Sequence, residues 1–148
     1  MNSESFLDQL LQRYARFSPH TRDCGIEITA LSAEGVSTQL PYREDWLGDA
    51  DSGRLHPGVL SVLIDSSAGV ALMAHLGQPE RIATLDLRID HLRPAFAGSA
   101  LHCHAHCYRK TSSIAFLSAE AWQDDRERPI ARAQLVFARN GVRNAGVV

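Results

Sequence analysis

One acidic residue lies inside the most apolar stretch of this 148-residue chain. Asp65 is followed by two serines and falls within the run from Val59 to Leu76. A carboxylate in such surroundings must be hydrogen-bonded, protonated or turned towards a cavity, because burying an unpaired charge is very costly. Asp65 is therefore either a satisfied core residue or a general base or nucleophile in a functional site.

The turn before this run is a second candidate, and its sequence is His56-Pro57-Gly58. Proline is favoured at the start of a helix, where the next N–H groups point outward unpaired and the helix dipole adds positive charge. Glycine also lets a ligand approach the backbone closely. The junction is thus either an ordinary helix start or a site for a carboxylate, a phosphate or a carbonyl oxygen that gains negative charge.

The spacing between these two features limits how they can cooperate. Pro57 and Asp65 are eight residues apart in the sequence, and this corresponds to about 12 Å along a helix. Asp65 therefore cannot reach a carbonyl group held at the start of its own helix. If both serve one reaction, the helix start must come from a second copy of the chain.

The elements that carry these residues follow from hydrophobic periodicity. Gly58–Leu76 is predicted to be a central helix that is apolar on nearly every side and stops at Gly77. Three- and four-residue spacing predicts an amphipathic helix over Glu4–Phe17, ended by Ser18-Pro19. The polar segment Arg43–Leu55 is predicted to be a loop. Strands are predicted over Gly25–Leu31, Val36–Tyr42, Ile82–Leu92, Leu101–Tyr108, Ser113–Trp122 and Ile130–Arg139.

The order of these elements indicates the fold class. A helix, two strands, a long buried helix and four strands predict an α+β fold, in which an antiparallel sheet curls around one central helix. In the strand Ile82–Leu92, alternation puts Leu85, Leu87 and Ile89 on one face and Thr84 on the other. We expect residues 1–148 to form a single domain, with an N-terminal helix in residues 1–20 and a flexible tail at 140–148.

Composition narrows the functional class. The chain is 45% hydrophobic with a formal net charge of -2, which excludes a disordered chain, a collagen or a coiled coil. A near-neutral charge gives no long-range field to recruit nucleic acid or a membrane, so neither is expected as a partner. Three cysteines without a disulfide framework or a CxxC motif, and no visible signal peptide, predict a cytoplasmic location.

Taken together, His56-Pro57-Gly58, Asp65, and the segment from Ile82 through Leu92-Arg93-Pro94 resemble the hotdog-fold acyl-CoA thioesterases of the PaaI-like, phenylacetate-pathway type. The likeness runs from about Gly25 to Arg139. The usual family signature is His-Gly-Gly with an acidic residue eight positions after the first glycine, a spacing that Asp65 keeps. Pro57 replaces the first glycine and has no N–H to donate.

The resemblance implies hydrolysis of short-chain or aromatic acyl-CoA by a homodimer or a homotetramer, with coenzyme A as part of the substrate and no other cofactor. It implies that Asp65 is the general base or nucleophile, that Thr84 places the water, and that a helix start of the partner subunit polarises the carbonyl. Gly58 is the next available donor after Pro57, and His56 shapes the turn. The residues implied to bind the substrate and its coenzyme A moiety are Pro57, Arg93, Lys110, Ser112 and Ser113.

Two other functions remain open on the sequence. Because Pro57 removes a donor, the chain could bind acyl-CoA without hydrolysing it. A hydratase acting on enoyl or hydroxyacyl thioesters would instead need a histidine and a carboxylate that face each other across the dimer.

Three histidines form a separate constellation. His102, His104 and His106 alternate along a predicted strand and therefore share one face, with Cys103 and Cys107 on the other. The outer two histidines are about 13 Å apart along a strand, so all three cannot bind one ion. We expect no metal site here.

Overall fold

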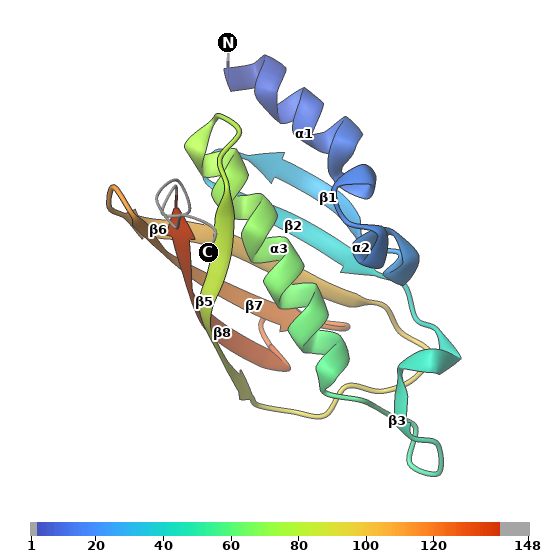
Figure 1. Ribbon diagram of the computed structural model, residues 1–148. Coiled ribbons are helices and arrows are strands. Elements are labelled where there is room, and N and C mark those ends of the chain that lie inside the picture. The colour runs from blue at the N-terminus through green and yellow to red at the C-terminus, as the bar shows by residue number, and fades with distance from the viewer. Residues whose placement is uncertain (1–2, 140–148) are drawn as a thin grey trace, which may run out of the picture.

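The computed structural model describes residues 3–139, and Figure 1 shows their arrangement. In chain order the elements are α1 (Ser3–Phe17), α2 (Pro19–Cys24), β1 (Glu27–Ser32), β2 (Gly35–Leu40), the 3-10 helix η1 (Glu44–Trp46), β3 (Leu47–Asp49), β4 (Arg54–Leu55), α3 (Gly58–Leu76), β5 (Ile82–His91), β6 (Leu101–Lys110), β7 (Ile114–Trp122) and β8 (Ala131–Arg139).

Six strands form one antiparallel sheet in the order β1-β2-β6-β7-β8-β5. Helix α3 lies across the inner face of this sheet, with most of its strand contacts to β6, β2 and β7 (Figure 1). Strands β1 and β5 are the two edges of the sheet. This architecture confirms the predicted α+β fold, with an antiparallel sheet wrapped around a long central helix.

The inner face of the sheet is shaped to receive a helix. Four strands, β2, β6, β7 and β8, each contribute one buried leucine to the core, whereas other inner positions of the sheet carry alanines that let the helix backbone approach closely. Nine of the nineteen residues of α3 are buried. α3 is long and apolar enough to cross a membrane. In this structure its apolar side chains pack against the sheet of the same chain. The buried alanines are Ala105, Ala115, Ala119, Ala121, Ala131 and Ala133.

A β-bulge in β5 corrects the predicted alternation. The register with β8 shifts between Thr84 and Asp86, so that Leu85 is the extra residue. The bulge turns Thr84 towards α3 on the same side as Leu87 and Ile89, which pack against the core, and leaves Leu85 58% exposed. The prediction that Leu85, Leu87 and Ile89 share one face was therefore wrong, because one inserted residue exchanges the two faces of the strand for the residues on one side of the bulge.

Four short elements lie where the sequence predicted no helix or strand. Ser18 caps a second helix, α2, by accepting a hydrogen bond from the Thr21 N–H, and Pro19 occupies its first turn. The proline therefore begins a helix as well as ending one. Segment 43–55 contains η1 and the β3–β4 hairpin. The predicted tail at 140–148 lies outside the described residues.

The outer face of the sheet carries the three histidines. His102, His104 and His106 are half-buried there, while Cys103 and Cys107 point into the core, as the alternation predicted. His104 Nδ1 lies 3.0 Å from the Ser37 hydroxyl. Burial lowers the pKa of His104, and the nearby Arg126 adds to this effect.

An almost fully buried ion pair joins Glu80, two residues before β5, to Arg139 at the end of β8. Arg139 donates two hydrogen bonds to the Glu80 carboxylate, at 2.8 and 3.2 Å, and the two side chains are 10% and 3% exposed. The hydrogen bond from Arg139 holds the pKa of Glu80 below its ordinary value. The pair therefore stabilises the fold above the unfolded-state pKa of about 4.3, and this contribution is lost as the pH falls.

We expect Glu80→Gln to lower the free energy of unfolding by about 1.5–3 kcal/mol at neutral pH, the range for a hydrogen bond to a charged group. Urea unfolding of both proteins at pH 7 and near pH 4 measures this difference, which should shrink at the lower pH. Glu34→Gln, in an exposed turn, is the matched control. A difference between wild type and Glu80→Gln that is equal at both pH values would contradict the assignment.

Candidate active site

Asp65 lies on α3 beside the edge strand β5. The Thr84 hydroxyl donates a 2.9 Å hydrogen bond to Asp65 Oδ1, and the Asp65 side chain is half-buried. Among residues 3–139, Thr84 is the one side chain that hydrogen-bonds to this carboxylate. Asp65 is therefore neither sealed in the core nor surrounded by solvent. The bulge at Leu85 makes the contact possible, because it lets Thr84 face α3 while Leu87 stays in the core.

His56 is held in one position by its neighbours. The backbone N–H of His56 donates a 2.7 Å hydrogen bond to the Trp46 carbonyl. A Cβ atom at Gly48 would lie 2.8 Å from the His56 Cα, so only glycine fits beneath this residue. A Cβ atom at Gly58 would lie 2.9 Å from His56 Nδ1. The two glycines thus leave room for the backbone and the ring of one histidine.

The imidazole of His56 also occupies the helix start. Gly58 N–H donates a 3.0 Å hydrogen bond to His56 Nδ1, and the N–H groups of Val59 and Leu60 donate to the carbonyls of His56 and Pro57. The Gly58 donor that the sequence offered to a substrate oxygen is therefore engaged by the chain itself. Because Nδ1 accepts this bond, the proton of the neutral ring is on Nε2, which becomes the donor at this turn.

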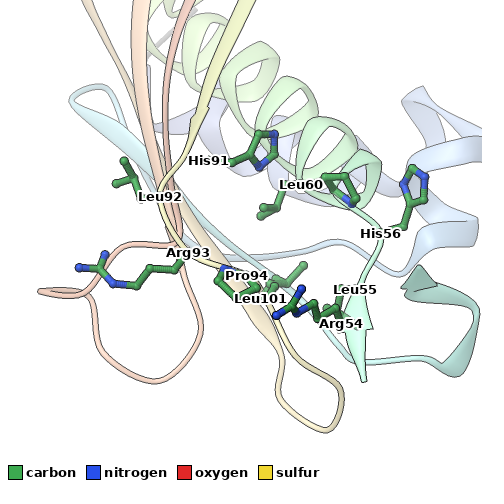
Figure 2. A pocket seen from close by; sticks show the side chains of 11 residues that line it. Arg54, Leu55, His56, Leu60, His91, Leu92, Arg93, Pro94 and Leu101 are labelled. Carbon is green, nitrogen blue, oxygen red and sulfur yellow. The ribbon is translucent and has the colours of Figure 1, made fainter. Parts of the chain in front are cut away.

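A cavity of about 440 Å³ opens beside the helix start, and we name it the His91 cavity. Its lining includes His56 and Pro57 from the turn, Leu60 from α3, His91 at the end of β5, and Arg54 from β4. Figure 2 shows the His91 ring pointing towards α3, with Arg54 beside Leu55 and Leu101. Sequence reasoning missed Arg54 and His91, whose only signal was their closeness in sequence to His56 and Arg93.

The residues assigned to coenzyme A lie in two places, at opposite ends of strand β8. Arg93 borders the His91 cavity, but its side chain points away from it and donates to the Pro129 carbonyl at 2.6 Å (Figure 2). Lys110, Ser112 and Ser113 belong to the β6–β7 hairpin, beside the last residue of β8. Arg93 lies beside the first residues of β8 instead. Eight residues of a strand separate the two groups by about 25 Å.

Within residues 3–139, no group of three or more histidine, cysteine, aspartate or glutamate side chains is arranged to hold a metal ion. The outer-face histidines have Glu120 as a neighbour, since it pairs with His104 in the sheet. The Glu120 carboxylate is engaged by Arg126 at 2.7 Å. This face is a polar surface whose carboxylate already has a cationic partner.

Known proteins resemble this chain in sequence and in fold. The model of the family described as "Thioesterase superfamily" matches residues 52–130, more than half of the chain. A crystal structure of a Pseudomonas aeruginosa protein is 32% identical, with a TM-score of 0.80 over 90% of this chain and 98% of that one. The PaaI protein of the Escherichia coli phenylacetic acid degradation operon shares the fold at 17% identity, with a TM-score of 0.81 over 93% of this chain and 96% of that one.

A curated relative supports the same grouping over a shorter span. A Halobacterium salinarum protein with a provisional esterase name is 31% identical over 74 residues. The match covers 48% of this chain and 49% of that relative, so the chain spans about half the length of the curated relative that it matches. On the family model and the Pseudomonas structure, the chain belongs to the thioesterase superfamily.

Proposed function

We propose that this protein hydrolyses acyl-CoA thioesters of short-chain or aromatic acids, with a site shared between two subunits of a homodimer. The observation that carries the proposal is the Asp65 carboxylate, held by Thr84 at the open edge of the sheet. Membership of the thioesterase superfamily gives the reaction class. Release of free thiol from a panel of acetyl-, hexanoyl-, benzoyl-, phenylacetyl- and palmitoyl-CoA tests the proposal directly.

The edge strand β5 supports the homodimer. It is ten residues long, and Leu85 and the adjoining Leu92 are 58% and 49% exposed. A long unpaired edge with exposed leucines is a surface that proteins usually cover. Pairing with β5 of a second copy would cover the edge and both leucines. A homotetramer formed from two such dimers is compatible with this arrangement.

Antiparallel pairing of two β5 strands also assembles the site. Asp65 is next to Thr84, near the start of β5, whereas His56 shares a cavity with His91 at its end. In an antiparallel pair the start of one strand lies beside the end of the other. Asp65 of one subunit then lies near His56 of its partner, as the 12 Å separation along α3 requires.

The proposed reaction uses these groups in a fixed order. Asp65 accepts a proton from water as the water oxygen attacks the thioester carbonyl, or the carboxylate attacks the carbonyl itself. The partner's helix start, through Nε2–H of its His56, donates to the oxygen that becomes negative. The C–S bond then breaks, and the coenzyme A thiolate takes up the proton. In the route by direct attack, breaking the C–S bond leaves a mixed anhydride on Asp65, and the water that hydrolyses this anhydride to the free acid supplies the proton. The hydrogen bond from Thr84 occupies Asp65 Oδ1, so Oδ2 is the carboxylate oxygen that accepts the proton of the water.

The same pairing explains how separated cations act together. The hairpin with Lys110, Ser112 and Ser113 is near the start of β5, so antiparallel pairing brings it towards the partner's His91 cavity with Arg54 and Arg93. Phosphate groups favour such clusters of arginine and lysine. We therefore assign the coenzyme A phosphates to a cluster built from both subunits.

The hydratase alternative fits less well. A hydratase histidine must accept a proton from the water that adds to the double bond, whereas the hydrogen bond from the Gly58 N–H occupies His56 Nδ1 and keeps the ring proton on Nε2. Assaying crotonyl-CoA for water addition in the same panel separates the two reactions.

A second candidate, acyl-CoA binding without hydrolysis, is favoured by Pro57, which lacks an N–H. Pro57→Gly adds a donor at the helix start and so distinguishes the two. If His56 already serves as the donor, we expect kcat for phenylacetyl-CoA to change less than about tenfold. A gain of about 10²–10³-fold, the effect of one oxyanion donor, would instead show that the wild-type chain is a binding protein.

A further inference from the structure

Two cavities border His56. One is the His91 cavity, and the other is a smaller cavity of about 250 Å³, which we name the Trp46 cavity. The Trp46 cavity lies between α2, the end of β2, η1 and the first two turns of α3. His56 lines both cavities. A thioester whose carbonyl is held by His56 therefore has one cavity available for each of its two arms.

The two cavities differ in charge. Arg54 and Arg93 border the His91 cavity. The Trp46 cavity has one acidic residue, Asp45, whose carboxylate pairs with Arg43 at 2.6 Å. Its other polar residue besides His56 is His20, which contacts Cys24 Sγ at 3.8 Å. The phosphate-bearing arm is attracted to the side where Arg54 lines the cavity and Arg93 lies at its border, which leaves the Trp46 cavity for the acyl arm.

The walls of the Trp46 cavity suit an apolar group. Trp46 is fixed by a 3.1 Å hydrogen bond from its ring N–H to the Pro41 carbonyl and by the Arg43 guanidinium 4.4 Å from its ring centroid. Val62 stands opposite on α3, one turn before the level of Asp65. A wall fixed in this way gives the cavity a defined size. Its apolar lining residues are Cys24, Leu40, Trp46, Val59 and Val62.

We infer that the Trp46 cavity binds the acyl group of the substrate and selects compact acyl groups, aromatic ones in particular, over long chains. The inference rests on the thioesterase function proposed for this site. A dry cavity of about 150 Å³ is enough to hold benzene. The 250 Å³ of the Trp46 cavity therefore accommodates an aromatic ring with its linking carbons. A palmitoyl chain would extend beyond it into solvent.

Val62 offers the sharpest test of this assignment. Val62→Phe fills the cavity, and we expect it to lower the ratio of kcat/KM for phenylacetyl-CoA to that for acetyl-CoA by at least about tenfold, since a misfitted group in an apolar pocket changes selectivity by about 10–200-fold. Val62→Ala enlarges the cavity and should raise the relative kcat/KM for phenylbutanoyl-CoA. Val136→Phe, on the outer side of β8, is the matched control and should leave both ratios unchanged.

A binding measurement separates this inference from the proposed hydrolysis. In an Asp65→Asn background, calorimetry compares the affinities for phenylacetyl-CoA and for free coenzyme A. We expect the acyl group to strengthen binding, and Val62→Phe to remove most of that gain. This result supports the acyl cavity even if wild type hydrolyses none of the thioesters. Equal affinity for the two ligands, or selectivity ratios unmoved by both Val62 variants, would overturn it.

Discussion

Replacing Asp65 with asparagine is expected to lower kcat for acyl-CoA hydrolysis by about 10²–10⁴-fold, the usual contribution of a positioned proton acceptor. The amide keeps the shape of the carboxylate and can still accept the hydrogen bond from Thr84. It cannot take a proton from water or attack a carbonyl. The loss should therefore appear in kcat, with little change in the binding of acyl-CoA.

Free-thiol release from phenylacetyl-CoA measures this loss, and thermal unfolding checks that the variant remains folded. Asp124→Asn changes an exposed loop carboxylate and is the matched control, for which we expect wild-type turnover. Unchanged turnover in Asp65→Asn would exclude Asp65 from the mechanism. Loss of turnover together with loss of folding would show that the Asp65–Thr84 bond is structural.

Much of the fold follows from sequence periodicity because strong patterns leave few alternatives. The predicted helix Gly58–Leu76 has the observed bounds, since a residue favourable at each helix end flanks a long apolar run. The four strands that follow it begin and end within two residues of their predicted limits. The local sequence determines where these elements begin and end, and their packing against one another stabilises them.

The details of the site depend on contacts that no local pattern reveals. The bulge at Leu85 turns Thr84 towards Asp65, yet the sequence around it alternates without interruption. The ring of His56 captures the Gly58 N–H because Gly48 and Gly58 leave space on two sides of this residue. Periodicity describes which face a residue occupies, but it contains no information on which backbone donor a side chain will reach.

The chemistry of the helix start illustrates the same limit. From the sequence, loss of the Pro57 N–H points to Gly58 as the substitute donor. In the structure the Gly58 N–H is bonded to His56 Nδ1, and the donor role passes to Nε2 of the same imidazole. In the proposed mechanism this one hydrogen bond moves the donor from the backbone to a side chain, so that His56 takes the role for which the sequence pointed to Gly58.

Two inactive variants, Asp65→Ala and His56→Ala, are expected to regain activity when they share a dimer. We expect each variant alone to lose about 10²-fold or more in kcat. A heterodimer has one site in which both residues are changed and one in which Asp65 of one subunit meets His56 of the other, both intact. Random association makes half of the dimers heterodimers, so about one quarter of wild-type activity should return.

Refolding the two variants together from urea forms the heterodimers, and native mass spectrometry of differently tagged chains counts them. The control mixes Asp65→Ala with the double variant Asp65→Ala/His56→Ala, which forms the same dimers but no intact site and should remain inactive. Activity that stays at the level of the separate variants, despite heterodimers in the expected proportion, would place Asp65 and His56 of one site in the same subunit. A thioester carbonyl and its attacking water cannot bridge the roughly 12 Å of helix between the helix start and Asp65 within a single chain, so this outcome would exclude the proposed mechanism.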